Sequence, residues 1–259
     1  MFKKILFLVT PSGVCAQAAD TAVALAAGSG ARLYVLCVMH AAEHCWDALF
    51  DTPPPEEAEA RKTAVGAYFR QRLAQASPAG PGQEARCAVE TTCGFTDVEA
   101  QRFAWRIGAD LIVAGCDPDA PEAARDGRAG QRESIARLAQ NARCPVLLVS
   151  GGPAAGAVAG CAHFSRILAA TDFSRESDHA IHYAALLART LKSQLDVLHV
   201  VEGDRPLPPE ALAQIERSLA ARYDADAGPS GLARFAVAVG QPGETIVDHA
   251  RAQGADLIV

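Results

Sequence analysis

The hexapeptide GADLIV at residues 108–113 occurs again at residues 254–259, where it ends the chain. A short apolar run after an acidic residue favours a strand that is buried on both faces. The first copy continues through Gly115 and an acidic segment, whereas the second stops at Val259. A repeated strand of this kind indicates a duplicated unit.

Two further pairs of segments extend the repeat over most of the chain. KKILFLVTPS at 3–12 matches SRILAATDFS at 165–174, and GARLYVLCVMH at 30–40 matches KSQLDVLHVVE at 192–202. The copies are offset by 162 residues in the first pair and by 146 in GADLIV, chiefly because the first copy has a longer connection after its second strand-like run. The chain therefore contains two diverged copies of one unit.

Short β-rich apolar runs alternate with helical patterns in both copies, which predicts parallel sheets with crossover helices on both faces. In the first copy we expect strands at 3–10, 32–39, 84–90, 110–114 and 145–149 and helices at 14–28, 56–76, 96–107 and 131–142. In the second we expect strands at 166–171, 195–201, 232–239 and 256–259 and helices at 174–190, 208–224 and 243–253. The predicted fold class is α/β with two tandem open parallel sheets, the second lacking a last helix and strand.

The boundary between the copies has the composition of a linker. The segment SGGPAAGAVAG at 150–160 consists of small residues and one proline, which is typical of a connection between domains. We therefore expect a first domain at residues 1–150, a linker at 151–163 and a second domain at 164–259.

The bulk composition argues against several classes of protein. The net charge is −6 without a sustained basic run, which argues against nucleic acid as a partner. No apolar stretch approaches the ~18 residues that span a bilayer, and the amino-terminal MFKKILFLVTPSG lacks the cleavage site of a signal peptide. The eight cysteines contain no CxxC pair, which favours free thiols. We therefore expect a cytoplasmic protein that contacts neither membrane nor nucleic acid.

In this order and spacing, KKILFLVT, GARLYVLCVMH, GADLIVAG and ARCPVLLVS resemble a domain of the universal stress protein family. RILAATDFS, LDVLHVVE and the second GADLIV resemble another such domain. The resemblance implies a five-stranded parallel sheet of the adenine-nucleotide α-hydrolase-like type in each. It also implies that a complete second domain continues through a glycine-rich loop, a helix and a fifth strand, so we expect this chain to be a fragment or a truncated product.

Nucleotide-binding members of that family carry an aspartate after the first strand and a loop of the form G-x2-G-x9-G-[ST] after the fourth. Glycines let backbone N–H groups approach phosphate oxygens, and a helix N-terminus adds partial positive charge. In the first copy Gly115 matches the first loop glycine. However, Thr10 holds the aspartate position, Pro118 the second glycine position, and Arg132 and Glu133 the Gly-Ser positions.

The remaining candidates for cofactor binding differ between the copies. In the first, Gly127 and Gly130 could form a cradle in a shifted register, although acidic side chains in the same loop would oppose phosphate. The second keeps the adenine half of the site, since Asp172 stands in ATDFS and Val200 or Val201 ends the next strand. Asp172 also fits another role, as the N-terminal cap of the following helix.

Three further groups could carry chemistry, and each has a plainer interpretation. The first is a loop with side chains that could bind a metal, His40, His44 and Cys45 near Asp47. The second is a pair of histidines on one helix, His179 and His182. The third is a thiol at the start of a helix, Cys15. The loop has no spacing that fixes ligand geometry, and histidines three apart also suit a helix surface. A thiol is often a small buried hydrophobe. We therefore expect no metal site and no catalytic constellation.

These observations predict a non-enzymatic stress-response protein that acts through protein contacts, with at most vestigial binding of adenine nucleotide. ATP is possible in the complete protein, but we expect no cofactor for this chain. The alternative is an ATP-binding switch or a slow ATPase whose site lies in the second domain. Family domains often associate through their fifth strands, so the apolar edge at residues 144–150 is the expected site of self-association.

Overall fold

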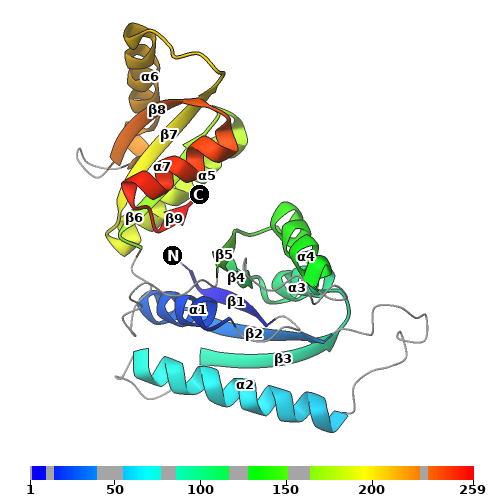
Figure 1. Cartoon of the computed structure of the whole chain (residues 1–259). Helices are drawn as coiled ribbons and strands as arrows, with labels where there is room; N and C mark the ends of the chain where they lie inside the picture. Colours follow the sequence, from blue (N-terminus) through cyan, green and yellow to red (C-terminus); the bar gives the residue numbers. More distant parts are fainter. Residues whose placement is uncertain are drawn as a thin grey trace. The chain divides into compact units, whose positions relative to one another are not determined.

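The structure of the chain is a computed structural model in which two compact units are distinguished, Met1–Ala162 and His163–Val259 (Figure 1). It describes residues 2–9, 15–39, 55–76, 86–116, 128–150, 164–227 and 233–259. The segment at 151–163, expected to be a linker, lies outside the described residues. Each unit is a parallel sheet with helices on both faces, which confirms the predicted fold class.

Unit 1 contains a five-stranded parallel sheet in the order β3-β2-β1-β4-β5. Helices α1 and α2 pack on one face, where Phe69 of α2 meets Phe7, and helices α3 and α4 cover the other, around Leu6 and Leu8 (Figure 1). The elements are β1 (Lys4–Val9), α1 (Ala16–Ser29), β2 (Arg32–Met39), α2 (Pro55–Ala76), β3 (Cys87–Cys93), α3 (Thr96–Ile107), β4 (Leu111–Cys116), α4 (Arg128–Asn141) and β5 (Val146–Ser150).

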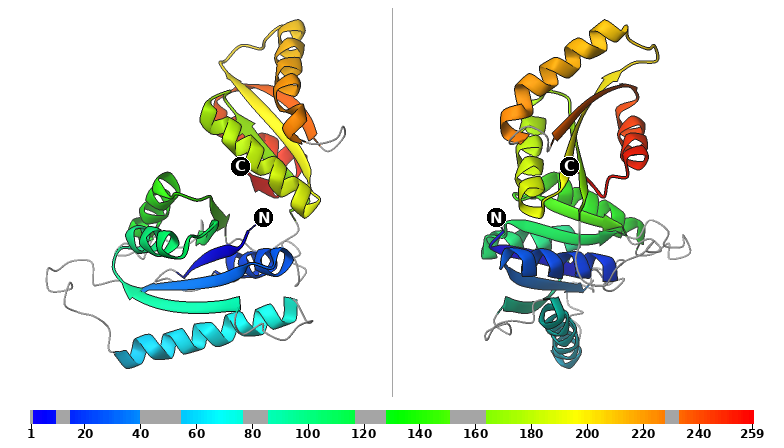
Figure 2. Two further views of the ribbon diagram at one scale, coloured as in Figure 1. Left: turned by 180° about the vertical axis from the view of Figure 1, so that it is seen from behind. Right: turned by 90° about the vertical axis from the view of Figure 1, so that its left-hand side faces the viewer.

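Unit 2 contains a four-stranded parallel sheet in the order β8-β7-β6-β9. Figure 2 shows α5 and α6 on one face of this sheet and α7 on the other. Two apolar clusters, around Ile181 and around Ala250, fill these faces. The elements are β6 (Arg166–Thr171), α5 (Arg175–Leu191), β7 (Gln194–Glu202), α6 (Pro209–Ala227), β8 (Ala233–Gly240), α7 (Pro242–Gln253) and β9 (Leu257–Ile258).

Two elements of unit 1, β3 and α4, differ from the sequence prediction by three residues at a boundary, and the other boundaries of that unit differ by at most two. Strand β3 begins at Cys87, three residues later than expected, and continues through Thr91 and Thr92, because its register pairs it along β2 as far as Met39. Helix α4 begins at Arg128 rather than at 131. A glycine inside a helix costs only about 1 kcal/mol, so Gly130 does not prevent the earlier start.

The GADLIV repeat ends a helix and begins a strand in both units. Its glycine ends the preceding helix in the left-handed conformation, with φ of +63° at Gly108 and +66° at Gly254. Such a conformation favours glycine over residues that carry a Cβ. The chain can then turn directly from the helix into the next strand.

The aspartate of the repeat holds the amino end of the first strand of its unit. Asp110 Oδ2 accepts hydrogen bonds from the backbone N–H groups of Lys3 at 2.6 Å and Lys4 at 2.8 Å. Asp256 Oδ2 accepts the equivalent bonds from Ser165 at 2.7 Å and Arg166 at 2.9 Å. The fourth strand of each copy is thereby fixed beside the first, in register.

A cation completes this arrangement in both units. Lys4 Nζ donates to the carbonyl of Ile107 at 2.6 Å, and Arg166 Nη1 donates to the carbonyl of Gln253 at 2.6 Å. Each carbonyl belongs to the last turn of the helix that precedes GADLIV, where acceptors lack partners within the helix. One strand thus binds both the helix end and the strand that follows it.

The last three residues of the chain continue the ladder of unit 2. Strand β9 pairs with β6, the N–H of Val259 donates to Leu168 O at 2.8 Å, and the N–H of Ala170 donates to Val259 O at 3.1 Å. The side chains are nevertheless less covered than in unit 1, since Ile258 is 44% exposed and its counterpart Ile112 is 0% exposed.

Replacement of Asp256 by alanine should lower the free energy of unfolding of unit 2 by about 1–2 kcal/mol, because two backbone donors lose a charged acceptor. Urea unfolding of the full chain, followed by circular dichroism, measures this change. The matched control is Asp224→Ala on α6, which removes an exposed carboxylate from the same unit. Equal stabilities of the two variants would contradict the role given to Asp256.

Amide hydrogen exchange at Leu257–Val259 should be at least tenfold faster than at Leu111–Val113. Strand β4 lies between β1 and β5, whereas β9 has β6 as its one neighbour in the described sheet, and chain ends are ordered only where they are held. Exchange measured by mass spectrometry or NMR provides the comparison within one sample. Similar protection of the two segments would contradict this expectation.

Candidate functional site

The candidate site of each unit lies at the carboxyl ends of its first and fourth strands. The strand order reverses between β1 and β4 in unit 1 and between β6 and β9 in unit 2. In open parallel sheets, ligands bind in the crevice at this position. Of the unit 1 candidates, Thr10, Pro118 and Gly127 lie outside the described residues.

In unit 1, the side chain of Cys15 packs over Gly115, the glycine that the sequence placed at the start of a phosphate loop. A Cβ added to Gly115 would lie 3.1 Å from Cys15 Sγ and 3.4 Å from the Cβ of Ala18, and closer still to the Cβ of Cys15. The glycine at this position is therefore explained by the close approach of α1 to β4.

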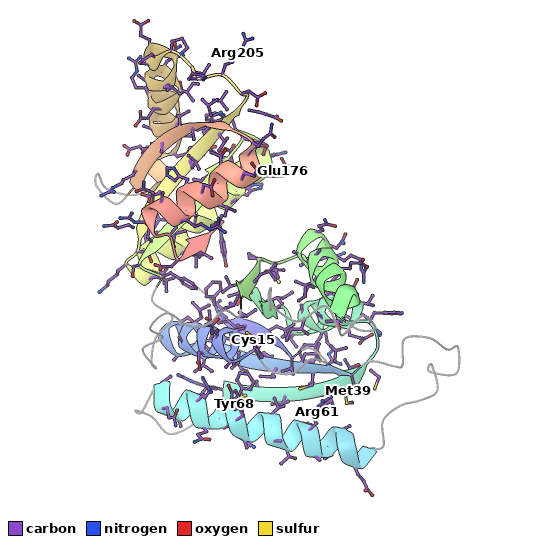
Figure 3. The ribbon with its side chains drawn as sticks, viewed as in Figure 1. Cys15, Met39, Arg61, Tyr68, Glu176 and Arg205 are labelled. Atoms are coloured by element: carbon purple, nitrogen blue, oxygen red, sulfur yellow. The ribbon has the colours of Figure 1, made fainter. Side chains whose placement is uncertain are left out.

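Cys15 lies at the start of α1 and is labelled in Figure 3, as is Tyr68 of α2. Burial raises the pKa of Tyr68, and the nearby Cys15 thiol raises it further when ionised. Cys15 provides no side-chain cap to the helix. Its position is that of a packing residue between a helix and a strand.

The other unit 1 candidates lie within α4. Gly130 is in the first turn of the helix, and Arg132 and Glu133 follow it in helical conformation. Glu133 lies 3.7 Å from Arg137 one turn later, as an exposed ion pair. A cradle built on Gly130 would therefore use the first turn of α4 rather than a loop ahead of it.

In unit 2, Asp172 follows β6 and is exposed. Its Oδ1 accepts a hydrogen bond from the N–H of Ser174 at 2.9 Å. The cap of α5 is Ser174, whose Oγ accepts from the N–H of Ser177 at 3.1 Å. Asp172 was expected as a possible cap and instead closes the turn two residues earlier, as aspartates commonly do.

This turn keeps Asp172 ionised. Hydrogen bonds from the Ser174 hydroxyl, from the Ser174 N–H and from the Ser177 hydroxyl lower the pKa of Asp172 from 3.8 to about 2. An exposed carboxylate of this kind can accept hydrogen bonds from a ligand such as a ribose. The structure therefore places a charged acceptor at the carboxyl edge of β6.

Phe173, next to Asp172, has an unusual backbone conformation. Its φ is +65°, which non-glycine residues adopt rarely and at some energetic cost. The conformation is held by a hydrogen bond from its N–H to Thr171 Oγ1 at 3.0 Å and by its ring, which lies 4.5 Å from the His199 ring. His199 Nδ1 also lies 2.8 Å from the carbonyl of Thr171.

A polar network joins β6 to α5 and α6 beneath this turn. Arg222 binds Asp178 through two bonds of 2.6 and 3.1 Å, and Tyr223 donates to Asp178 Oδ1 at 2.6 Å. The Tyr223 hydroxyl also lies 3.0 Å from Thr171 Oγ1. Arg222 first, and then Tyr223, lower the pKa of Asp178, so the Asp178 carboxylate is held in its charged form beside Arg222.

Val200 and Val201 lie near the carboxyl end of β7, which ends at Glu202, and both are half-buried. Val200 packs against the apolar cluster on the α7 face. The β7 residue that contacts the end of β6 is His199, which the sequence did not single out. The sequence did contain a sign of this contact. His199 aligns with Cys37 of the first copy, so that a polar ring takes the place of a buried thiol.

The remaining chemical candidates are not brought together. His179 and His182 lie exposed on α5. His40, His44, Cys45 and Asp47 are outside the described residues. Within the part of the chain that the structure describes, no three metal-ligand side chains form a group, and no helix is long and apolar enough to cross a membrane.

Comparison with known proteins assigns both halves of the chain to one family. The model of the universal stress protein family matches residues 1–150 and 163–259. No curated protein matches the chain in a sequence search.

Two solved structures resemble the chain over nearly its whole length. One is a universal stress protein from Archaeoglobus fulgidus DSM 4304, with 14% identity, a TM-score of 0.65, and coverage of 98% of this chain and 83% of that one. The other is from Pseudomonas aeruginosa UCBPP-PA14 and is also assigned to the universal stress proteins. It has 17% identity, a TM-score of 0.60, and coverage of 99% and 81%. At these identities the likeness shows the fold.

The low pKa of Asp172 predicts an acid-sensitive component of stability. Because the folded pKa is about 2 and the ordinary value is 3.8, the contribution is present above about pH 4 and is lost as the pH falls towards 2. In Asp172→Asn, urea unfolding of unit 2 should depend less on pH across this interval. Asp204→Asn, at an exposed aspartate of the same unit, is the control, and identical profiles for Asp172→Asn and the unmodified chain would refute the assignment.

Proposed function

Because this chain belongs to the universal stress protein family, we propose that it is a non-enzymatic stress-response protein that acts through protein contacts. The packing of Cys15 over Gly115 carries this proposal. A phosphate loop uses glycines to bring open backbone N–H groups to the ligand, but Gly115 is explained here by the close approach of α1 to β4 and so does not by itself indicate such a loop. Unit 1 then serves as a structural domain that presents surfaces to partners.

The described thiols fit this role. Cys15, Cys37, Cys87, Cys93 and Cys144 are free. Burial raises the pKa of Cys37 and of Cys87 to about 11, so both are protonated and unreactive at neutral pH. Free thiols of this kind are consistent with the cytoplasm, which we propose as the location.

The expected contact surface is the β5 edge. Strand β5 lies at one end of the unit 1 sheet, and Leu148 on it is 44% exposed. An edge strand with an exposed apolar residue favours pairing with another strand. Residues 144–150 are therefore the proposed site of self-association through sheets.

The second candidate function is an adenine-nucleotide switch, or a slow ATPase, whose site lies in unit 2. The exposed, ionised Asp172 beside the strained Phe173 favours it, since strained backbone is concentrated at functional sites. Asp172 would accept hydrogen bonds from the ribose, and Val200 or Val201 would contact the base. Such a function would also require a phosphate loop after the fourth strand of unit 2.

Titration of the full chain with ATP distinguishes the two functions. We expect no binding at micromolar concentrations in calorimetry, because Pro118, Arg132 and Glu133 stand where a phosphate loop has its glycines and serine. Binding that is lost in Gly130→Val would overturn this expectation for unit 1 and establish the shifted cradle. Binding that is lost in Asp172→Ala, but kept in the matched control Asp204→Ala, would favour the nucleotide switch.

A further inference from the structure

Helix α3 of unit 1, together with its N-cap residue Phe95, which has an extended backbone, carries a stripe of exposed side chains with the spacing of a coiled-coil seam. Phe95 is 73% exposed, Val98 46% and Trp105 74%, and the side chain of Arg102 is 74% exposed. Positions 95, 98, 102 and 105 are separated by three, four and three residues, as the a and d positions of a heptad are. We call these four residues the α3 seam.

The α3 seam is not needed to hold α3 on its own sheet. The opposite side of the helix packs through Ala100, Phe103 and Ala104, and Asp97, 7% exposed, binds Arg137 of α4 at 2.8 Å. A groove of about 370 Å³ lies along one flank of α3, between Trp105 and Glu90 of β3. Helix α3 is therefore held on its sheet by the side that faces the sheet and α4, while its other side is exposed to solvent.

The second copy of the unit provides an internal comparison. Helix α7 occupies the position of α3, and GADLIV aligns the two helices. The four positions that correspond to the α3 seam are polar in α7: Gln241, Glu244, Asp248 and Arg251. The shared fold therefore does not require apolar residues there, and the seam is a property of unit 1 alone.

We propose that the α3 seam pairs with the α3 seam of a second copy of this chain, in antiparallel orientation. The order of residues is symmetric about position 100, so antiparallel pairing places Phe95 opposite Trp105 and Val98 opposite Arg102 at both ends. A two-fold interface needs such self-complementarity. Aromatic pairs and an arginine stem over an apolar residue are favourable contacts.

Charge does not oppose this pairing. Arg102 binds Glu99 at 2.9 Å on its own helix, which neutralises the centre of the seam. Burial of one Phe and one Trp from each copy removes at most about 600–1,000 Å² of surface, since both side chains are already partly covered, and this is below the 1,200–2,000 Å² typical of stable complexes. The dimer is therefore weak and concentration-dependent. The inference rests on α3 and not on the proposed function.

Sedimentation of the full chain tests the pairing. The average mass should rise with concentration beyond that of the monomer. The variant Phe95→Gln/Val98→Glu/Trp105→Arg, which installs the α7 residues, should associate at least tenfold more weakly while keeping its circular dichroism and melting temperature. The control Val247→Gln removes an apolar residue of α7 that is 40% exposed and should associate like the unmodified chain.

Trp105 reports on the same contact directly. The chain has two tryptophans, so Trp46→Phe leaves Trp105 as the one fluorophore, and its emission should shift to the blue as the dimer forms. A chain that stays monomeric, or association that the triple variant leaves unchanged and Leu148→Lys on β5 abolishes, overturns the proposal. In the second case the β5 edge is the contact.

Cross-linking tests the orientation. Ten helical residues span about 15 Å, whereas a disulfide needs Cα atoms about 4.4–6.8 Å apart. Antiparallel pairing predicts that a mixture of Phe95→Cys and Trp105→Cys forms disulfide-linked dimers above the level of the unmodified chain. Either variant alone should not. Cross-linking of Phe95→Cys alone at the level of the mixture overturns the antiparallel arrangement.

Discussion

The aspartate of GADLIV binds the amino end of the central strand in both units, and the rest of each fold depends on this contact. Asp110 and Asp256 each accept two backbone N–H groups from the first strand of their unit. The contact joins segments that are 90 to 107 residues apart along the chain. Because it sets the register of the first strand against the fourth, it also fixes where the carboxyl ends of these strands meet.

At those carboxyl ends the two copies have diverged in chemistry. Unit 1 closes the position with a side chain, since Cys15 packs over Gly115. Unit 2 keeps a polar edge, in which Asp172 stays ionised and Tyr223 connects Thr171 to Asp178. The same fold therefore has a tightly packed carboxyl end of the strands in unit 1 and a hydrogen-bonded one in unit 2. Both are possible because the aspartate contacts lie at the other end, the amino end of the first strand.

The helix that precedes GADLIV shows the same separation of scaffold from surface. In both copies it ends at a left-handed glycine and has its last turn bound by a cation from the first strand. The outward faces differ at four aligned positions, of which three are apolar in and beside α3 and all four are polar in and beside α7. The two copies therefore share the glycine and the cation that hold the helix, while the residues that face outward differ between them.

The sequence by itself determined the strand and helix order, the duplication and the family, because periodicity and turn glycines act within a few residues. For the same reason it located Gly115, Asp172, Val200 and Val201 near the carboxyl ends of strands, whereas their binding of a nucleotide stays a prediction. Only the tertiary structure decided that Cys15 fills the space over Gly115, that Ser174 caps α5, and that His199 and Tyr223 join the edge of unit 2. These contacts connect residues from different elements, and their distances depend on how closely each helix packs on its sheet.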